Sequence, residues 1–78
     1  AKEECHFSNG TQRVRLLYRL FFDRQELAYF DSERGKFVAV AEMMESDVKS
    51  WNQDKERLQT AMADVDLFCR HNYELAEP

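Results

Sequence analysis

The chain changes character at Glu42, and this change limits the folds that it can adopt. Before this point, short runs of aliphatic and aromatic residues are separated by polar turns. Residues 42–77 contain neither glycine nor proline, and residues that favour helices dominate. Strands followed by a helix are typical of an α+β domain, in which a helix covers one face of an antiparallel sheet.

Four strands are expected in residues 1 to about 41. They are ECHF before Asn9, RVRLLYRLFF (13–22), LAYFDS (27–32) and KFVAVA (36–41). Between the last two, Gly35 suits a hairpin turn, because glycine tolerates positive φ. The polar stretch DRQE is also turn-like. Because the connections are short, the strands are expected to form an antiparallel meander.

Alternation along residues 13–22 separates two faces of a strand. One face carries Leu16, Tyr18 and Leu20, whereas Arg15, Leu17, Arg19 and Phe21 lie on the other.

A helical region is expected over residues 42 to about 76, with start signals at Ser46 or Asp47. An interruption is plausible at WNQD, because Asn and Asp are weak helix formers. One stripe at near-helical spacing suits packing on the sheet: Trp51, Leu58, Met62, Val65 and Cys69. A second, mixed stripe would face along or above the sheet: Arg57, Ala61, Asp64, Phe68 and Asn72.

The length of 78 residues allows one small domain, spanning residues 1–78. One helix covers only part of a four-stranded sheet, so a partner chain is expected. The net charge of −4 and the absence of a basic stripe argue against nucleic acid as a partner. No apolar run is long enough to span a membrane.

Cys5 and Cys69 allow three interpretations. The favoured one is a disulfide between them, worth about 4 kcal/mol through closure of a long loop, which implies an oxidising compartment. With His6 and His71 they could instead hold zinc, although the spacing matches no standard pattern and no metal is expected. Cys69 could also be a nucleophile with His71 as its base. Residues two apart on a helix point about 200° away from each other, which disfavours this pairing.

Asn9-Gly10-Thr11 is an N-glycosylation acceptor triplet and indicates an exposed loop in a secretory protein. Asn-Gly is also a strong hairpin turn, and both interpretations of the motif are compatible.

Four stretches resemble the beta-1 domain of class II major histocompatibility complex (MHC) β chains. They are ECHFSNGTQRVRLL, FDSERGKFVAV, SWNQDKERL and VDLFCRHNYEL, and they follow one another in order over nearly the whole chain. The resemblance implies a four-stranded antiparallel sheet followed by one long, interrupted helix, which together form half of a peptide-binding groove. An α chain would supply the other half.

The resemblance assigns peptide-backbone contacts to Trp51, His71 and Asn72. An extended peptide has backbone groups that are costly to bury unpaired. Indole, imidazole and amide groups satisfy them without reading the peptide sequence, so one groove can bind many peptides.

Specificity is expected from pockets between those contacts. The resemblance places around a central pocket Glu3, Leu16, Tyr18, Thr60, Ala61, Asp64 and Phe68. The pocket near the carboxyl end of the peptide would have Leu20, Leu27, Asp47 and Ser50, with Asp47 paired to an arginine of the α chain. Phe37 and Arg57 would line a pocket between these two, and Ala76 the floor of the amino-terminal pocket.

Two departures from the family pattern are notable. Many relatives have a basic residue at the position of Ala61, whereas Glu3 and Asp64 are acidic here, so the central pocket is expected to prefer a basic or polar side chain. The usual LGRPD entry to the helix is MMESD here, which leaves the conformation of residues 43–46 open.

The resemblance implies antigen-peptide presentation to CD4 T cells, and neither catalysis nor a cofactor. The alternative is a nonclassical relative that assists or regulates peptide loading. Expected partners are the α chain, the peptide and the T-cell receptor, with the invariant chain and a peptide-exchange factor during loading. The expected location is the cell surface and endosomal or lysosomal membranes, as the luminal part of a type I membrane protein whose membrane segment is absent from this sequence.

Overall fold

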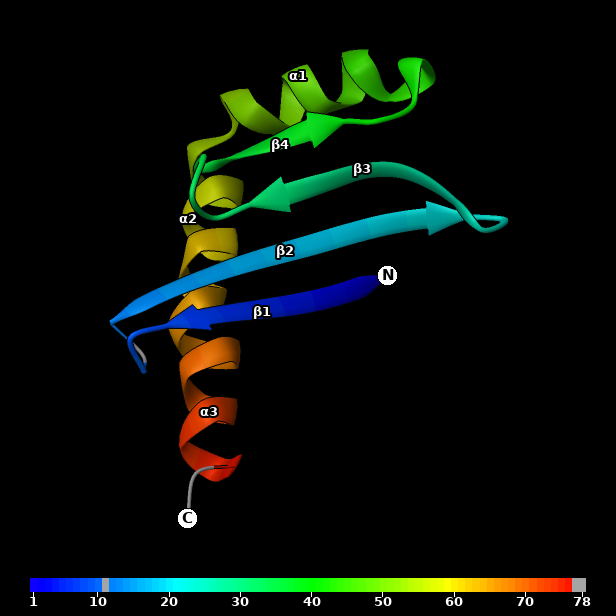
Figure 1. Cartoon of the computed structure of the whole chain (residues 1–78). Helices are drawn as coiled ribbons and strands as arrows, with labels where there is room; N and C mark the ends of the chain where they lie inside the picture. The colour runs from blue at the N-terminus through cyan, green and yellow to red at the C-terminus, as the bar shows by residue number, and fades with distance from the viewer. Residues whose placement is uncertain (11, 77–78) are drawn as a thin grey trace.

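A computed structural model describes residues 1–10 and 12–76, apart from the side chain of Ala76. Four strands form one antiparallel sheet in the order β1-β2-β3-β4 (Figure 1). Their bounds are β1 Lys2–Ser8, β2 Arg13–Phe22, β3 Gln25–Asp31 and β4 Lys36–Ala39. The predicted α+β class and the meander are confirmed.

Tight turns connect the strands. Asp23 and Arg24, with φ of 52° and 68°, form the two-residue turn between β2 and β3. Two positive φ angles match the right-handed twist of a hairpin. The predicted turn DRQE is therefore shorter than expected, because Gln25 already belongs to β3. Gly35 has φ of 68° in the next turn, where a residue with a side chain would be strained.

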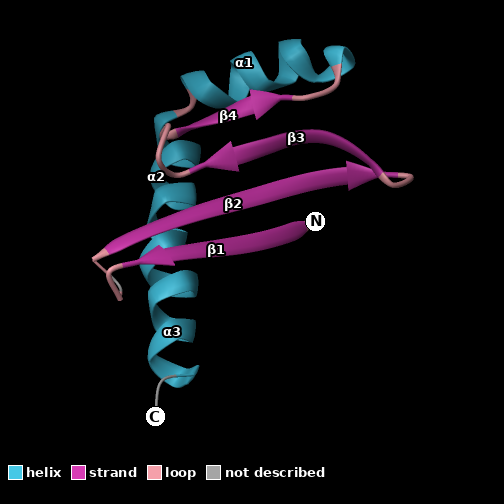
Figure 2. Cartoon of the chain, viewed as in Figure 1, coloured by secondary structure: helices cyan, strands magenta, loops and turns pink. Residues whose placement is uncertain are grey.

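The helical region begins at Glu42, as predicted, although its first α-helix already starts at Glu45, before the expected start signals at Ser46 or Asp47. Figure 2 shows this region following β4. It consists of five consecutive pieces. They are the 3₁₀ turn η1 Glu42–Met44, α1 Glu45–Gln53, α2 Lys55–Asp64, the π-helical segment η2 Val65–Arg70 and α3 His71–Ala76. The unusual entry MMESD thus spans the last two residues of η1 and the first three of α1, which follow one another directly.

Strand β4 ends two residues before the predicted end at Ala41. The backbone N–H groups of Val40 and Ala41 both donate to the carbonyl of Leu27, each at 2.9 Å. A regular ladder does not pair two successive N–H groups with one carbonyl, so the chain turns here towards η1.

The predicted interruption of the helix lies at Asp54. Its backbone is extended, with φ of −93° and ψ of 100°. Its carboxylate accepts hydrogen bonds from the backbone N–H groups of Glu56 and Arg57, at 3.1 and 3.2 Å. Asp54 is therefore the N-cap of α2 and allows the helix to restart in a new direction.

The segment from α2 to α3 crosses one face of the sheet, and α1 lies along β4 (Figure 1). Leu16, Val65 and Cys69 form the buried core under this crossing, and Cys5 and Val14 pack against it. The disulfide joins Cys5 to Cys69, as predicted. Met62 was expected in the same stripe but is 41% exposed, because it lies at the margin of the buried face of α2.

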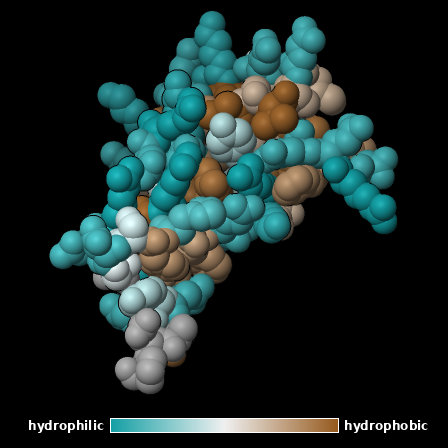
Figure 3. Space-filling model, viewed as in Figure 1, coloured by the Kyte–Doolittle hydropathy of each residue, from teal (hydrophilic) through white to brown (hydrophobic). Residues whose placement is uncertain are grey.

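The opposite face of the sheet is charged. Arg15 donates to Asp31 at 2.6 Å, and Arg19 donates to Glu4 at 3.0 Å and to Glu26 at 2.8 Å. Hydrophilic side chains gather on this face in Figure 3. The two faces of β2 therefore differ as the alternation predicts, and the apolar row of Leu16, Tyr18 and Leu20 faces the helices.

Candidate functional site

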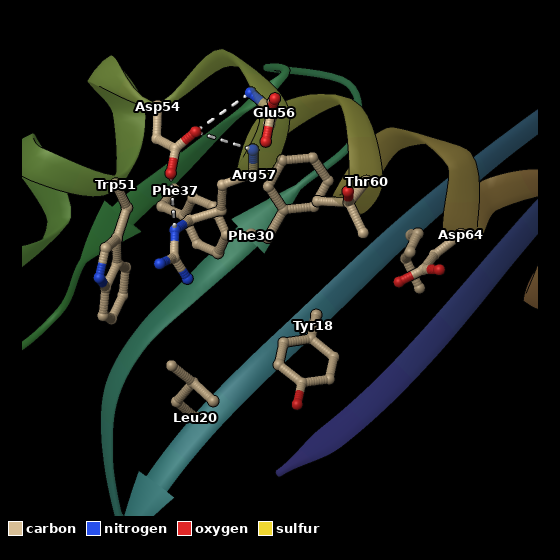
Figure 4. A pocket seen from close by; sticks show the side chains of 12 residues that line it. Tyr18, Leu20, Phe30, Phe37, Trp51, Asp54, Glu56, Arg57, Thr60 and Asp64 are labelled. Atoms are coloured by element: carbon tan, nitrogen blue, oxygen red, sulfur yellow. Dashed lines mark hydrogen bonds and ion pairs between the residues drawn. The ribbon is translucent and has the colours of Figure 1, made fainter.

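A cavity of about 600 Å³ lies between the helical segment and the sheet. It is lined by residues of β2, β3, β4, α1 and α2 and by the junction of the two helices (Figure 4). These residues are Leu16, Tyr18, Leu20, Phe30, Phe37, Trp51, Asp54, Glu56, Arg57, Thr60, Ala61 and Asp64.

The floor of the cavity is apolar and aromatic. Leu16, Tyr18 and Leu20 alternate along β2, so all three point to the helix side. Phe30 and Phe37 are opposite one another on β3 and β4, with ring centroids 5.1 Å apart. A floor of this kind favours apolar or aromatic parts of a ligand.

The wall near the helix break is aromatic and cationic. The rings of Trp51 and Phe37 meet edge-on, with their centroids 5.3 Å apart. The Arg57 guanidinium lies 5.8 Å from the centre of the Trp51 ring. Arg57 Nε is also 4.0 Å from the Asp54 carboxylate. Figure 4 shows the Arg57 side chain extending from α2 into the cavity beside Trp51.

Nine of the predicted peptide-contact residues line this cavity: Leu16, Tyr18, Leu20, Phe37, Trp51, Arg57, Thr60, Ala61 and Asp64. Phe30, Asp54 and Glu56 were not predicted. Alternation along β3 could have indicated Phe30, because it lies directly opposite Tyr18. Asp54 and Glu56 lie at the break between α1 and α2. They line the cavity because the helical segment changes direction at this break.

The other predicted residues lie outside the cavity. Asp47 and Ser50 are exposed on α1, Leu27 lies at the irregularity between β2 and β3, and Glu3 is opposite Tyr18 on β1. Phe68, His71 and Asn72 are exposed along η2 and the start of α3. The side chain of Ala76 lies outside the described part of the chain. The roles of these residues remain predictions.

The disulfide decides between the three interpretations of the cysteines. The sulfur of Cys69 is bonded to Cys5, so it is available neither as a nucleophile nor as a zinc ligand. His71 therefore has no thiol to activate, and the thiol-enzyme alternative is wrong.

The sheet forms the floor of this cavity, and the helical segment forms a wall on one side of it. Residues 1–77 match the family model of the class II histocompatibility antigen beta domain, and the chain belongs to this family. The resemblance seen in the sequence motifs is thus confirmed.

Curated relatives agree with the family match. The chain is 50% identical over 76 residues to the human HLA class II histocompatibility antigen DRB1 beta chain, covering 97% of this chain and 29% of the relative. It is 49% identical over 74 residues to the mouse H-2 class II histocompatibility antigen E-D beta chain, covering 95% and 28%. It is 48% identical over 77 residues to the dog DLA class II DR-1 beta chain, covering 99% and 29%. The chain thus spans less than a third of the length of these relatives.

Among the described residues, no helix combines the length and the apolar character needed to cross a bilayer.

Proposed function

We propose that this chain is the β half of a class II MHC α/β heterodimer that binds antigenic peptides and presents them to CD4 T cells. The observation that carries the proposal is the cavity of about 600 Å³, which has an apolar floor and a helical wall. Membership of the class II beta-domain family supports the same function.

An α chain as partner is supported by the edge of the sheet. Within the described residues, β1 pairs with β2 on one side only, so its other edge offers backbone groups to a further strand. A strand from an α chain would continue the sheet, and its helix would supply the second wall of the groove. Residues 1–78 would then form one domain of the assembly.

Backbone recognition is proposed for Trp51, His71 and Asn72. Trp51 lines the cavity, and an indole N–H is a donor without an acceptor function. His71 and Asn72 begin α3 with exposed side chains, within reach of a ligand that runs along the helix. Together they would satisfy the backbone groups of an extended peptide at both ends of the groove.

Pocket roles are proposed for the remaining predicted residues. Near the end of the groove formed by α1 they are Leu20, Leu27, Asp47 and Ser50, with Asp47 paired to an arginine of the α chain. Around the centre they are Glu3, Leu16, Tyr18, Thr60, Ala61, Asp64 and Phe68, with Phe37 and Arg57 between these two groups and Ala76 at the far end.

Finer parts of the proposal follow from the family. They are recognition by a T-cell receptor, binding of the invariant chain and a peptide-exchange factor during loading, and residence at the cell surface and in endosomal or lysosomal membranes. The proposal also includes attachment of a glycan to Asn9, whose side chain is exposed.

The test is co-purification of the full-length β chain with an α chain, followed by acid elution and mass spectrometry. A diverse set of peptides is expected. An empty groove would overturn the proposal and favour the nonclassical alternative, a chaperone or regulator of peptide loading.

A variant makes the test specific to the proposed contacts. Asn72→Ala removes an amide that would make two hydrogen bonds to the peptide, so dissociation of a labelled peptide is expected to accelerate about tenfold. Glu74→Ala is the matched control, because Glu74 is exposed on the same helix. Equal release rates for the two variants would contradict the assigned role of Asn72.

A further inference from the structure

The turn after β1 lies beside the last part of the helical segment (Figure 1). Asn9 and Gly10 belong to this turn, with φ of 54° and 67°. Gly10 has no side chain, and a Cβ at its position would lie 4.0 Å from the hydroxyl oxygen of Tyr73 on α3. The residue that follows the glycan acceptor therefore borders an aromatic side chain from the other end of the chain.

Phe7 completes an aromatic pair at this place. Its ring and the ring of Tyr73 are tilted by 46°, with their centroids 5.0 Å apart. Cys5 and Phe7 share one face of β1, and the disulfide of Cys5 shows that this face packs on the helical segment. Phe7 is 39% exposed and Tyr73 is half-buried, so the pair bridges β1 and α3 with part of its ring surface still in contact with water.

Both rings lie close to the acceptor. Phe7 precedes Asn9 by two residues, so their Cα atoms are at most about 7 Å apart. Tyr73 borders Gly10, the residue that follows Asn9. The side chain of Asn9 is exposed, and a group attached to it therefore starts next to the aromatic pair.

The chemistry of the attached group suits these rings. The first sugar of an N-linked glycan is N-acetylglucosamine, whose pyranose ring has a face lined with C–H groups. The face of an aromatic ring is electron-rich and apolar, so it attracts such C–H groups. Covalent attachment holds the sugar at a high effective concentration, which favours a contact that a free sugar would make only weakly. The glycan is therefore a better occupant for the pair than a separate molecule.

We propose that the first N-acetylglucosamine attached to Asn9 packs its C–H face on the pair formed by Phe7 and Tyr73. The proposal rests on glycosylation of Asn9, which is part of the proposed function. The packed sugar covers exposed ring surface and fastens the turn after β1 to α3. The glycan thereby stabilises the part of the helical segment that begins with His71 and Asn72.

The test compares the wild type with Thr11→Ala, which lacks the acceptor triplet, in the purified full-length α/β complex. Both are treated with an endoglycosidase that leaves one N-acetylglucosamine on each occupied asparagine, so they differ by one sugar at Asn9. We expect the trimmed wild type to unfold about 2–4 °C above trimmed Thr11→Ala. Mass spectrometry of the β chain measures the occupancy. A wild-type Asn9 without a sugar overturns both the glycan assignment and the packing, whereas an occupied Asn9 with equal unfolding midpoints overturns the packing alone.

Ring variants separate the sugar contact from any effect of the Thr11 side chain itself. Phe7→Leu keeps an apolar side chain but removes the ring, so the difference in midpoint caused by Thr11→Ala is expected to fall towards zero in this background. Tyr29→Leu is the matched control, because Tyr29 is a partly buried aromatic residue on β3, away from the turn, and it should keep the full difference. The same full difference in Phe7→Leu would overturn the proposal.

A second measurement needs no variant without the glycan. The trimmed wild-type complex is labelled with ¹³C in its sugars, and nuclear Overhauser contacts are recorded between the sugar C–H protons and aromatic ring protons. Contacts to the Phe7 ring are expected, and their loss in Phe7→Leu assigns them. Absence of these contacts in a complex with an occupied Asn9 overturns the packing.

Discussion

The side chain of Asn52 pairs with the backbone of Phe37 through two hydrogen bonds. The Phe37 N–H donates to Asn52 Oδ1 at 2.8 Å, and Asn52 Nδ2 donates to the Phe37 carbonyl at 3.0 Å. Asn52 thus takes the place of a neighbouring strand at the outer edge of β4 and holds α1 against the sheet. Trp51, the next residue, is thereby placed over the aromatic floor of the groove.

Asn52→Ala is expected to lower the free energy of unfolding of the full-length α/β protein by about 1–3 kcal/mol, because it leaves two part-buried backbone groups without partners. Thermal unfolding measures the change. Gln53→Ala is the control, since Gln53 is the exposed neighbour at the end of α1. An unfolding midpoint equal to that of the control would show that the pair does not hold the helix.

Loss of the disulfide should be more damaging. Cys5 and Cys69 are 64 residues apart in the sequence, and closing a loop of that length contributes about 4 kcal/mol in the chain-entropy treatment. The double variant Cys5→Ala/Cys69→Ala is expected to unfold at a much lower urea concentration, or to fail to assemble with the α chain. Assembly yield and urea midpoint are the measurements, with reduced wild-type protein for comparison. A double variant as stable as the oxidised wild type would contradict this role.

Stability should depend on pH through Asp31. The hydrogen bond from Arg15 holds the pKa of this buried carboxyl below its ordinary value of 3.8. As pH falls, the unfolded chain therefore takes up the proton first. The contribution is fully present above pH 3.8 and is lost as pH falls through the lower folded-state pKa.

Asp31→Asn removes this titration, so the free energy of unfolding of the variant is expected to decline less steeply with falling pH below about pH 4. Urea midpoints measured from pH 7 to the lowest pH at which the protein stays soluble test this. Glu45→Gln, at an exposed position on α1, serves as control and should keep the wild-type slope. Parallel curves for wild type and Asp31→Asn would refute the link.

Glycosylation of Asn9 can be tested with two substitutions in the acceptor triplet. Thr11→Ala should abolish the mass shift on enzymatic removal of N-glycans from secreted protein, whereas Thr11→Ser preserves the acceptor and should keep it. A shift that persists in Thr11→Ala would place the glycan elsewhere.

Much of the fold was predictable because its signals are local. The alternation of Leu16, Tyr18 and Leu20 assigns one face of β2 to the helices, and a glycine-free, proline-free second half predicts the helical region. Asp54 both interrupts the helical region and caps the start of α2. Both effects depend only on its immediate neighbours in the sequence. The resemblance to the family predicted a groove and most of the residues that line the observed cavity.

Two details of the structure differ from what the sequence predicted. Met62 fits the helical stripe, but it is 41% exposed, since it lies at the margin of the face of α2 that packs on the sheet. Strand β4 stops at Ala39 because Leu27, on another strand, accepts the next two N–H groups.

The sequence by itself determined the types of element, their order and the two faces of the sheet, because these depend on residue periodicity. Only the tertiary structure decided that Asn52 completes the edge of β4, that Phe30 joins the cavity floor, and that Arg57 and Asp64 line one cavity. Such relationships depend on how α1 and α2 dock on the sheet, and side chains far apart in the sequence meet only after that docking.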